Sequence, residues 1–332
     1  MNDEHSTVDG PTRHALIFIF ITIFLDTVSF GLIIQVLPEL IMDLTGEGVD
    51  RAVLYGGWLL FLFAFMQFFC APIIGNLSDR FGRRPVLLVS LFAFGIDYII
   101  MGFATTVVWL FVGRALSGIA GATFTTANAF IADVSTPEKR AQNFGLVGAA
   151  WGIGFIVGPG IGGILGEYGA RIPFFAAAGV SLTTVIYGLL VLPETLPKEN
   201  RRPFSIRRAN PVGALMEMRQ YPVIIGMFAA LVLFQIAHDA NPSVWTYYTI
   251  EKFKWTEKQI GYSLAFVGIA SAVSHGYLTR LVIPALGDRR TVFVGYPVMA
   301  LGFVTTAFAP NGWVLMLGIT TFCAGSIANP AL

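Results

Sequence analysis

Charged residues are scarce in this chain. Asp, Glu, Lys and Arg make up 12% of its 332 residues, whereas 55% of the residues are hydrophobic and the mean hydropathy is +0.71. A water-soluble domain carries about twice that charged fraction to cover its surface. The composition therefore predicts an integral membrane protein, and the net charge of +1 gives no electrostatic reason to expect a nucleic acid partner.

Motifs that would point to an enzyme or to a disulfide-bonded protein are also missing. The two cysteines, Cys70 and Cys323, fall in apolar stretches, which argues against a disulfide framework. The sequence contains no G-x-x-x-x-G-K-S/T phosphate loop and no H-E-x-x-H metal motif. We therefore expect no enzymatic activity, no cofactor and no bound metal.

Long apolar runs are what the chain has instead. A bilayer core about 30 Å thick needs about 20 apolar residues in each spanning helix. Ten such runs lie near residues 15–36, 53–74, 85–105, 107–130, 143–165, 173–192, 222–246, 261–284, 291–309 and 313–332. Because the polar N-terminus offers no small-residue cleavage site, the first run predicts a retained membrane helix and not a signal peptide.

A polar segment rich in Pro and Arg divides these runs into two groups. We expect a six-helix N-terminal bundle over residues 1–192, a cytoplasmic linker over 193–221, and an incomplete C-terminal bundle of about four helices over 222–332. Two related bundles of six helices are a common transporter plan, so an intact gene product is expected to continue for two more helices.

Basic residues are distributed unevenly between the two sides of the predicted bundle. The N-terminus and every second loop hold fifteen Lys and Arg residues, whereas the alternate loops hold five. Cytoplasmic loops carry the excess of basic residues in membrane proteins. The N-terminus is therefore expected in the cytoplasm.

Three motifs are more specific than hydropathy: GNLSDRFGRRP at 75–85, RALSG at 114–118 and GIGFIVGPGIGG at 152–163. The first resembles the signature between the second and third helices of the major facilitator superfamily, in the form found in twelve-helix drug:proton antiporters. The third resembles a motif associated with exporters. Together with LDTVSFGLIIQVLP at 25–38, they make the chain similar to bacterial tetracycline/proton antiporters over essentially its whole length.

This resemblance implies the major facilitator superfamily fold, with about ten helices of the six-plus-six plan in this chain, and a multi-pass location in the bacterial inner membrane. It implies alternating-access export of a drug in exchange for protons. A tetracycline-like compound is the first expected substrate, with a magnesium-chelated drug as one form, and other amphipathic toxic compounds are the second. The lipid bilayer and protons are the other expected partners.

Ionisable residues inside the apolar runs are candidates for proton and substrate binding. An ionised Asp at a helix centre costs about 2.5–3.5 kcal/mol to insert, so Asp26 is expected to face a polar cavity. Asp97 and Arg114 also lie near mid-helix, and the resemblance assigns all three to the substrate and proton machinery. A purely structural ion pair is the alternative for Asp97 and Arg114, and Gln67 is a further candidate.

Two small-residue patterns accompany these charges. On the fourth run, a stripe at helical spacing predicts a cavity wall; it consists of Arg114, Gly118, Gly121, Thr125 and Asn128. On the fifth run, overlapping G-x-x-x-G spacings allow close helix packing. The resemblance adds that this glycine motif, with Gly154, Gly158, Pro159 and Gly162, seals the cavity and limits leak.

The signature at 75–85 concentrates charge in Asp79, Arg80, Arg83 and Arg84. Its arginines fit the cytoplasmic side, and topology alone would explain them. We expect Gly75 and Gly82 to permit a tight turn, and the acid beside them to favour a neighbouring helix end. The segment is therefore predicted to act as a gating loop, which latches the two bundles together in the outward-facing state.

The C-terminal half contributes His238, Asp239 and His275, which could bind protons or contact substrate. Two departures from the tetracycline antiporter pattern are Met299, where those proteins carry an acid in the ninth helix, and Gln35, where they usually have Pro. Three other functions remain open: an uptake symporter or facilitator for a small metabolite, a non-transporting membrane scaffold or sensor, and an inactive fragment.

Overall fold

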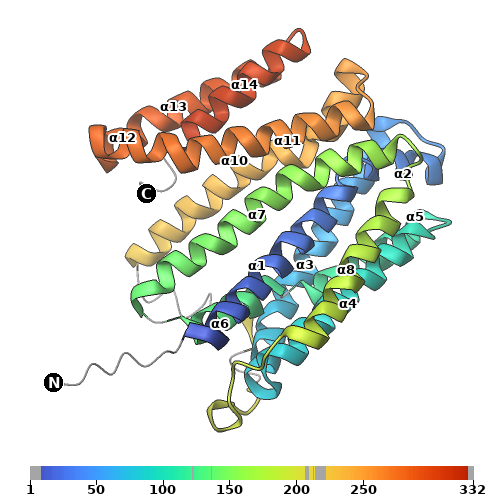
Figure 1. Cartoon of the computed structure of the whole chain (residues 1–332). Coiled ribbons are helices and arrows are strands. Elements are labelled where there is room, and N and C mark those ends of the chain that lie inside the picture. Colours follow the sequence, from blue (N-terminus) through green and yellow to red (C-terminus); the bar gives the residue numbers. More distant parts are fainter. Residues whose placement is uncertain are drawn as a thin grey trace.

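The computed structural model describes residues 9–121, 123–135, 137–205, 209–211, 213 and 222–327. All regular structure in these ranges is helical, as predicted (Figure 1). The helices of the N half are α1 Asp9–Ile33, α2 Leu37–Thr45, α3 Val49–Phe81, α4 Arg83–Gly102, α5 Val107–Ala120, α6 Thr123–Val134, α7 Pro137–Gly166 and α8 Ile172–Val191. Those of the C half are α10 Pro222–Phe253, α11 Glu257–Val273, α12 Thr279–Leu286, α13 Asp288–Ala307 and α14 Gly312–Gly325, with a π-helical turn, η2 Ser274–Leu278, between α11 and α12.

Each of the ten predicted apolar runs corresponds to helix in the described residues. Seven helical stretches in the described chain are long and apolar enough to cross a membrane, and α14 is a shorter apolar helix. Two runs are each built from consecutive helices: the fourth from α5 and α6, and the eighth from α11, η2 and α12. The stretch between α8 and α10 contains a short 3-10 helix, η1 Lys198–Asn200.

In the N half, α1 packs along both α7 and α8, while α4 packs against α5 and α8. Toward α2, the core of this half is built around Leu32, Leu40 and Phe174, which are all buried. Toward the chain's N-terminus, a second cluster forms around Phe18 and Phe130. The large apolar side chains on the outer faces of α3 and α8 remain exposed, as expected for helices that contact lipid.

In the C half, α13 and α14 pair closely, and α11 packs against α14. Trp245 of α10, Ile260 of α11 and Leu315 of α14 form the buried core of this half. The indole Nε1 of Trp245 donates a hydrogen bond of 2.9 Å to the Ser263 hydroxyl, which satisfies the one polar atom of that side chain.

The two halves meet where α7 crosses α11 (Figure 1). A Cβ atom on Gly163 would lie 2.7 Å from the backbone oxygen of Glu257 and 3.1 Å from the Cα of Gly261, so the glycines let the two backbones touch. This contact lies at the end of the bundle that carries α2, called the α2 end below. Toward the opposite end, called the linker end, the sites of Gly148 and Gly152 face open space. Among the described residues, the close contacts between α7 and the C half therefore lie from Ile156 toward the α2 end, and the two glycine sites toward the linker end meet nothing from the C half.

The signature at 75–85 is not a loop, and this part of the prediction was wrong. Helix α3 continues through the motif to Phe81, and α4 begins at Arg83. The chain turns at Gly82 alone, whose φ of +106° is a conformation that other residues rarely adopt. Gly75 lies inside α3, so it does not form part of the turn.

The packing of α7 on α1 predicts a position-specific effect of side-chain volume. A Cβ on Gly158 would lie 2.7 Å from the Val28 carbonyl oxygen, whereas nothing lies within 4 Å of the corresponding site on Gly160. We expect Gly158→Val to lower the free energy of unfolding by about 1–3 kcal/mol through overpacking. The matched Gly160→Val variant should change it much less, as measured by thermal unfolding in detergent. Equal losses in both variants would contradict the close contact.

Candidate functional site

Asp97 and Arg114 form an ion pair in the middle of the N half. The Arg114 Nη2 donates to Asp97 Oδ2 at 2.7 Å; Arg114 is 6% exposed and Asp97 is 0% exposed. Gly113 makes room for the carboxylate, because any side chain there would collide with Asp97 Oδ1. A buried pair of this kind is costly to form but far more costly to break, since the remaining charge would lie unpaired in a low dielectric.

Asp26 approaches this pair from α1. Its Oδ1 atom is buried and has no hydrogen-bond partner, whereas the Oδ2 atom of Asp97 pairs with Arg114. Tyr98 of α4 is buried beside Asp97 and interacts electrostatically with Asp26, Asp97 and Arg114. The structure thus brings together three charged residues that are 71 and 17 positions apart along the chain. Sequence reasoning missed Tyr98, whose only signal was its position next to Asp97.

The residues of the predicted stripe on the fourth run have two structural roles: some pack against α3, and others are exposed. A Cβ on Gly118 would lie 2.6 Å from the Phe63 backbone oxygen of α3, so this position serves close helix packing. Gly121 ends α5, and its carbonyl accepts a hydrogen bond of 2.9 Å from Gln67 Nε2. Thr125 and Asn128, which lie on α6, have exposed side chains, as residues of a cavity wall would.

The glycine motif of α7 faces α1. The sites of Gly154, Gly158 and Gly162 lie against the backbone of α1 near Phe24, Val28 and Leu32, respectively. Gln35 Nε2 donates to the Pro159 carbonyl at 3.3 Å and to the Leu32 carbonyl at 3.2 Å. Gln35, which stands where Pro was expected, therefore connects the end of α1 to α7 by hydrogen bonds.

The signature residues form a charge network around Arg83 at the linker end. Its Nη1 atom pairs with Asp79 at 2.6 Å, and its Nε atom pairs with Asp133 of α6 at 3.0 Å. The Arg83 guanidinium also donates to the Ser78 hydroxyl at 2.5 Å. Arg84 instead donates to the Leu189 carbonyl of α8 at 2.7 Å. Arg80 stacks on the neighbouring Phe81 ring, 5.1 Å from its centroid.

The same network holds the polar segment that follows α8. The backbone N–H of Arg83 donates to Glu194 at 2.8 Å, and the backbone N–H of Arg202 donates to the Asp79 carbonyl at 3.0 Å. Asn76 and Ser205 exchange two hydrogen bonds, of 3.0 and 3.3 Å. In the part of the chain that the structure describes, the signature is therefore joined to residues 194–205 and not to the C half.

The C-half candidates lie on α10 and on the π-helical turn. Asp239 accepts a hydrogen bond of 2.9 Å from Gln235 one turn earlier, whereas the side chain of His238 lies outside the described residues. The His275 ring, on the π-helical turn, lies 3.3 Å from the Ser326 hydroxyl. Met299 is buried in the core of the C half, so it contributes packing where an acid was expected.

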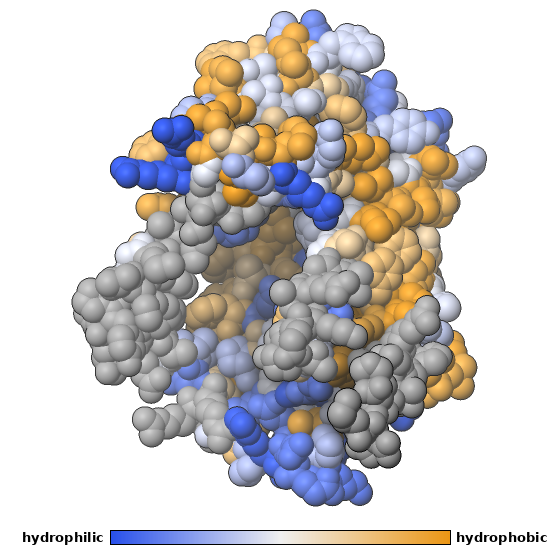
Figure 2. All heavy atoms as spheres, turned by 60° about the vertical axis from the view of Figure 1, so that its left-hand side comes forward, coloured by the Kyte–Doolittle hydropathy of each residue, from blue (hydrophilic) through white to orange (hydrophobic). Residues whose placement is uncertain are grey.

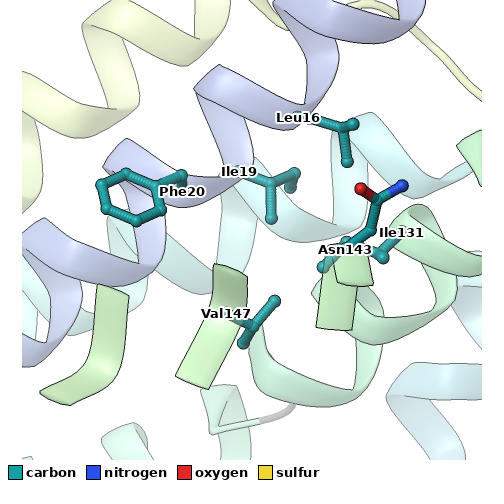
Figure 3. A pocket seen from close by; sticks show the side chains of 6 residues that line it. All are labelled: Leu16, Ile19, Phe20, Ile131, Asn143 and Val147. Atoms are coloured by element: carbon teal, nitrogen blue, oxygen red, sulfur yellow. The ribbon is translucent and has the colours of Figure 1, made fainter. Parts of the chain in front are cut away.

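A hollow opens on the face shown in Figure 2, with hydrophobic atoms at its back and hydrophilic atoms below it. A smaller pocket lies between α1, α6 and α7 (Figure 3). Five of the six side chains that line the pocket are apolar, and Asn143 is the exception; its amide donates to Ser135 at 2.8 Å. Within the described residues, no group of three or more His, Cys, Asp or Glu side chains is arranged to hold a metal ion.

Comparison with known proteins identifies the fold. The family model of the Major Facilitator Superfamily matches residues 19–332. The chain belongs to this superfamily of membrane transporters. It is 38% identical to the class C tetracycline resistance protein of Escherichia coli, over 97% of this chain and 80% of that protein. It is 30% identical to multidrug resistance protein 2 of Bacillus subtilis, over 95% of this chain and 78% of the relative.

Solved structures of two transporters have the same fold. The human organic anion transporter MFSD10 superposes with a TM-score of 0.71 at 22% identity, over 97% of this chain and 85% of that one. A mutant of the nucleoside transporter NupG gives a TM-score of 0.74 at 13% identity, over 96% and 81% of the two chains. The recognition made from the signature motifs is thereby confirmed, and so is the expectation of a transporter and not an enzyme.

The buried ion pair of this superfamily member predicts a non-additive effect on stability. Asp97→Asn should lower the free energy of unfolding by about 3–5 kcal/mol, because it leaves the Arg114 charge buried and unpaired. The double variant Asp97→Asn/Arg114→Gln should be more stable than Asp97→Asn alone. Thermal unfolding in detergent measures both, and losses that simply add would contradict the pairing.

The contacts of Glu194 predict how firmly the polar segment is held. Glu194→Ala removes the acceptor for the Arg83 and Leu196 backbone N–H groups and the partner of Arg201. We expect trypsin to cleave after Arg201 several-fold faster in this variant, because cleavage requires local release of the segment; the bond after Arg202 precedes Pro203 and resists trypsin. The matched Glu199→Ala variant, at an exposed position of η1, should be cleaved at the wild-type rate. Unchanged cleavage in Glu194→Ala would show that these bonds do not hold the segment.

Proposed function

We propose that the chain exports a tetracycline-like drug across the bacterial inner membrane in exchange for protons. The observation that carries this proposal is the buried, unpartnered Oδ1 atom of Asp26 near the Asp97–Arg114 pair, in a chain whose relatives include tetracycline and multidrug resistance proteins. A carboxyl group at membrane depth without a fixed partner is suited to gain and lose a proton.

The uneven distribution of basic residues supports an orientation with the N-terminus and the linker end in the cytoplasm. In that orientation the α7–α11 contact closes the side toward the outside, and we infer that the halves are open toward the cytoplasm. This is the state in which an exporter takes up its substrate. The drug enters between the halves, and the halves then rock about the α7–α11 contact.

Protons that enter from the outside bind Asp26 and reset the carrier. Each proton that returns down the membrane potential releases about 2.3 kcal/mol per 100 mV, which drives accumulation even at one-to-one exchange. Drug and proton must exclude one another at this site, since simultaneous binding would carry both in the same direction. The Asp97–Arg114 pair contributes fixed charges to the same region, and we assign it to substrate and proton coupling with Gln67 and Asn128.

The remaining candidates have supporting roles in this cycle. The signature residues around Arg83 are proposed to latch the two bundles together in the outward-facing state; in the arrangement described above they are joined to residues 194–205 instead. The glycine motif of α7 seals the path to the outside through its contact with α1. His238, Asp239 and His275 are proposed to contact the substrate from the C half.

Everted membrane vesicles test the proposal directly. Addition of tetracycline with magnesium should collapse a preformed pH gradient, reported by a pH-sensitive dye, and Asp26→Asn should abolish the response because the side chain can no longer bind the proton. Equal insertion of both proteins must be shown by immunoblot. If only other drugs collapse the pH gradient, the chain is still an antiporter but tetracycline is not its substrate. If no drug in a panel collapses the gradient, the export function is rejected.

A further inference from the structure

A carboxyl pair links the two halves at the α2 end, away from the central charges. Glu39 lies on α2 of the N half, and Glu257 is the first residue of α11 in the C half. The two side chains are within hydrogen-bonding contact of each other. The Oε2 atom of Glu39 is buried and has no hydrogen-bond partner among the described residues. The pair is therefore an inter-half contact, and it is made by two groups of the same charge type.

The packing around Glu257 fixes it in this position. The Thr256 side chain accepts from the Gln259 N–H and the Gln259 side chain accepts from the Thr256 N–H, so the start of α11 is held by a capping box. The Cβ and Cγ atoms of Glu257 lie 3.1 and 3.3 Å from where a side chain on Gly166 of α7 would begin. The glycine at the end of α7 is thus what admits the glutamate to the interface.

The electrostatic surroundings of the pair are acidic. Asp43, one turn further along α2, adds a third negative group near Glu39. The nearest basic side chain in sequence, Lys258, instead forms an exposed ion pair of 3.4 Å with Glu167 of α7. Arg51 lies in the first turn of the neighbouring helix α3, but among the described residues no basic side chain forms an ion pair with Glu39 or Glu257.

Two carboxyl groups can form a hydrogen bond only when one of them carries a proton. Without it, two negative charges face one another at a partly buried contact and repel. Burial, followed by the proximity of Glu257 and Asp43, raises the pKa of Glu39 from its ordinary value of 4.5 to about 7.

The raised pKa of Glu39 determines how the contact between the halves depends on pH. Separation of the halves removes Glu257 from Glu39 and lowers the pKa of Glu39 toward its ordinary value, while Asp43 stays on the same helix. Closing the α2 end therefore takes up a proton within the window from pH 4.5 to about 7. The stabilisation of the closed state is therefore complete below the lower value. It is lost as the pH rises through the upper one.

We propose that Glu39 and Glu257 form a proton-operated latch, which holds the two halves together at the α2 end while they share a proton and releases them when it is lost. The latch is separate from Asp26 and acts on closure of the bundle whatever compound is carried. In the orientation given above it senses the outer solution, so an acidic exterior favours return to the inward-open state.

Cysteine labelling of purified protein tests the latch without any substrate. Thr246, buried at the inter-half contact where its hydroxyl lies 3.4 Å from the Ile34 carbonyl, is replaced by Cys in a Cys70→Ala/Cys323→Ala background. The rate of maleimide labelling is measured from pH 5.5 to 8.5. It is divided by the rate for Tyr168→Cys, an exposed position at the α2 end, to remove the intrinsic pH dependence of the thiol.

The normalised rate should rise with pH, by at most about tenfold per pH unit, with a midpoint near neutrality. Glu39→Gln and Glu257→Gln should each abolish this rise and keep labelling slow, because an amide replaces the protonated acid and can still donate to its partner. Asp43→Asn is the matched control, which removes a neighbouring charge but leaves the pair, and should retain the rise.

Two outcomes would overturn the latch: a flat profile in the parent protein, or a rise that persists in both Gln variants. Neither depends on whether tetracycline is exported. A failure of the export assay with Asp26→Asn and a failure of the latch are therefore distinguishable.

Discussion

Close backbone contact along α7 is the constraint on which the rest of the structure depends. One face of this helix lies on α1 through Gly154, Gly158 and Gly162, and another face lies on α11 through Gly163. A single helix of the N half thereby sets both the internal packing of that half and its contact with the C half. The placement of Gln35, Glu39 and Glu257 follows from this geometry, since all three lie where α7 ends.

Charge is scarce in this chain, and each buried charge has a distinct arrangement. Arg114 is neutralised by Asp97, and the Arg83 guanidinium is shared between two carboxylates and the Ser78 hydroxyl. Asp26 has no such partner for its buried oxygen. The contrast separates residues that hold the fold from one that is free to change its protonation state.

The apolar runs and the three motifs were sufficient to predict the all-α membrane fold, its ten helical segments and the superfamily. The Asp97–Arg114 pair was also within reach, because both residues lie at mid-helix in consecutive runs. Gly82 lies in the turn as expected, but the loop predicted over residues 75–85 was wrong, since the composition of residues 75–81 is that of a loop although their backbone is helical. Helical spacing predicted which residues of the fourth run share one face, but it could not predict which of these residues pack against α3.

The Glu39–Glu257 contact had no signal in the sequence. The two residues are separated by more than two hundred positions, and only the crossing of α7 and α11 brings them together. Tyr98 was missed for a related reason, because a tyrosine in an apolar run is as consistent with the lipid-facing surface as with a charged site.

The π-helical turn at Ser274–Leu278 divides one membrane-spanning segment into two parts, α11 and α12, whose contact faces are set independently. A π turn adds a residue to the helix, so the side chains beyond it are rotated by about 100° relative to an unbroken α-helix. Before the turn, α11 presents its small residues to the opposite half; after it, α12 packs on α13 within its own half. A residue such as Gly261 can therefore be selected for inter-half fit without changing which face of α12 meets its neighbour, and the periodicity of one portion carries no information about the other.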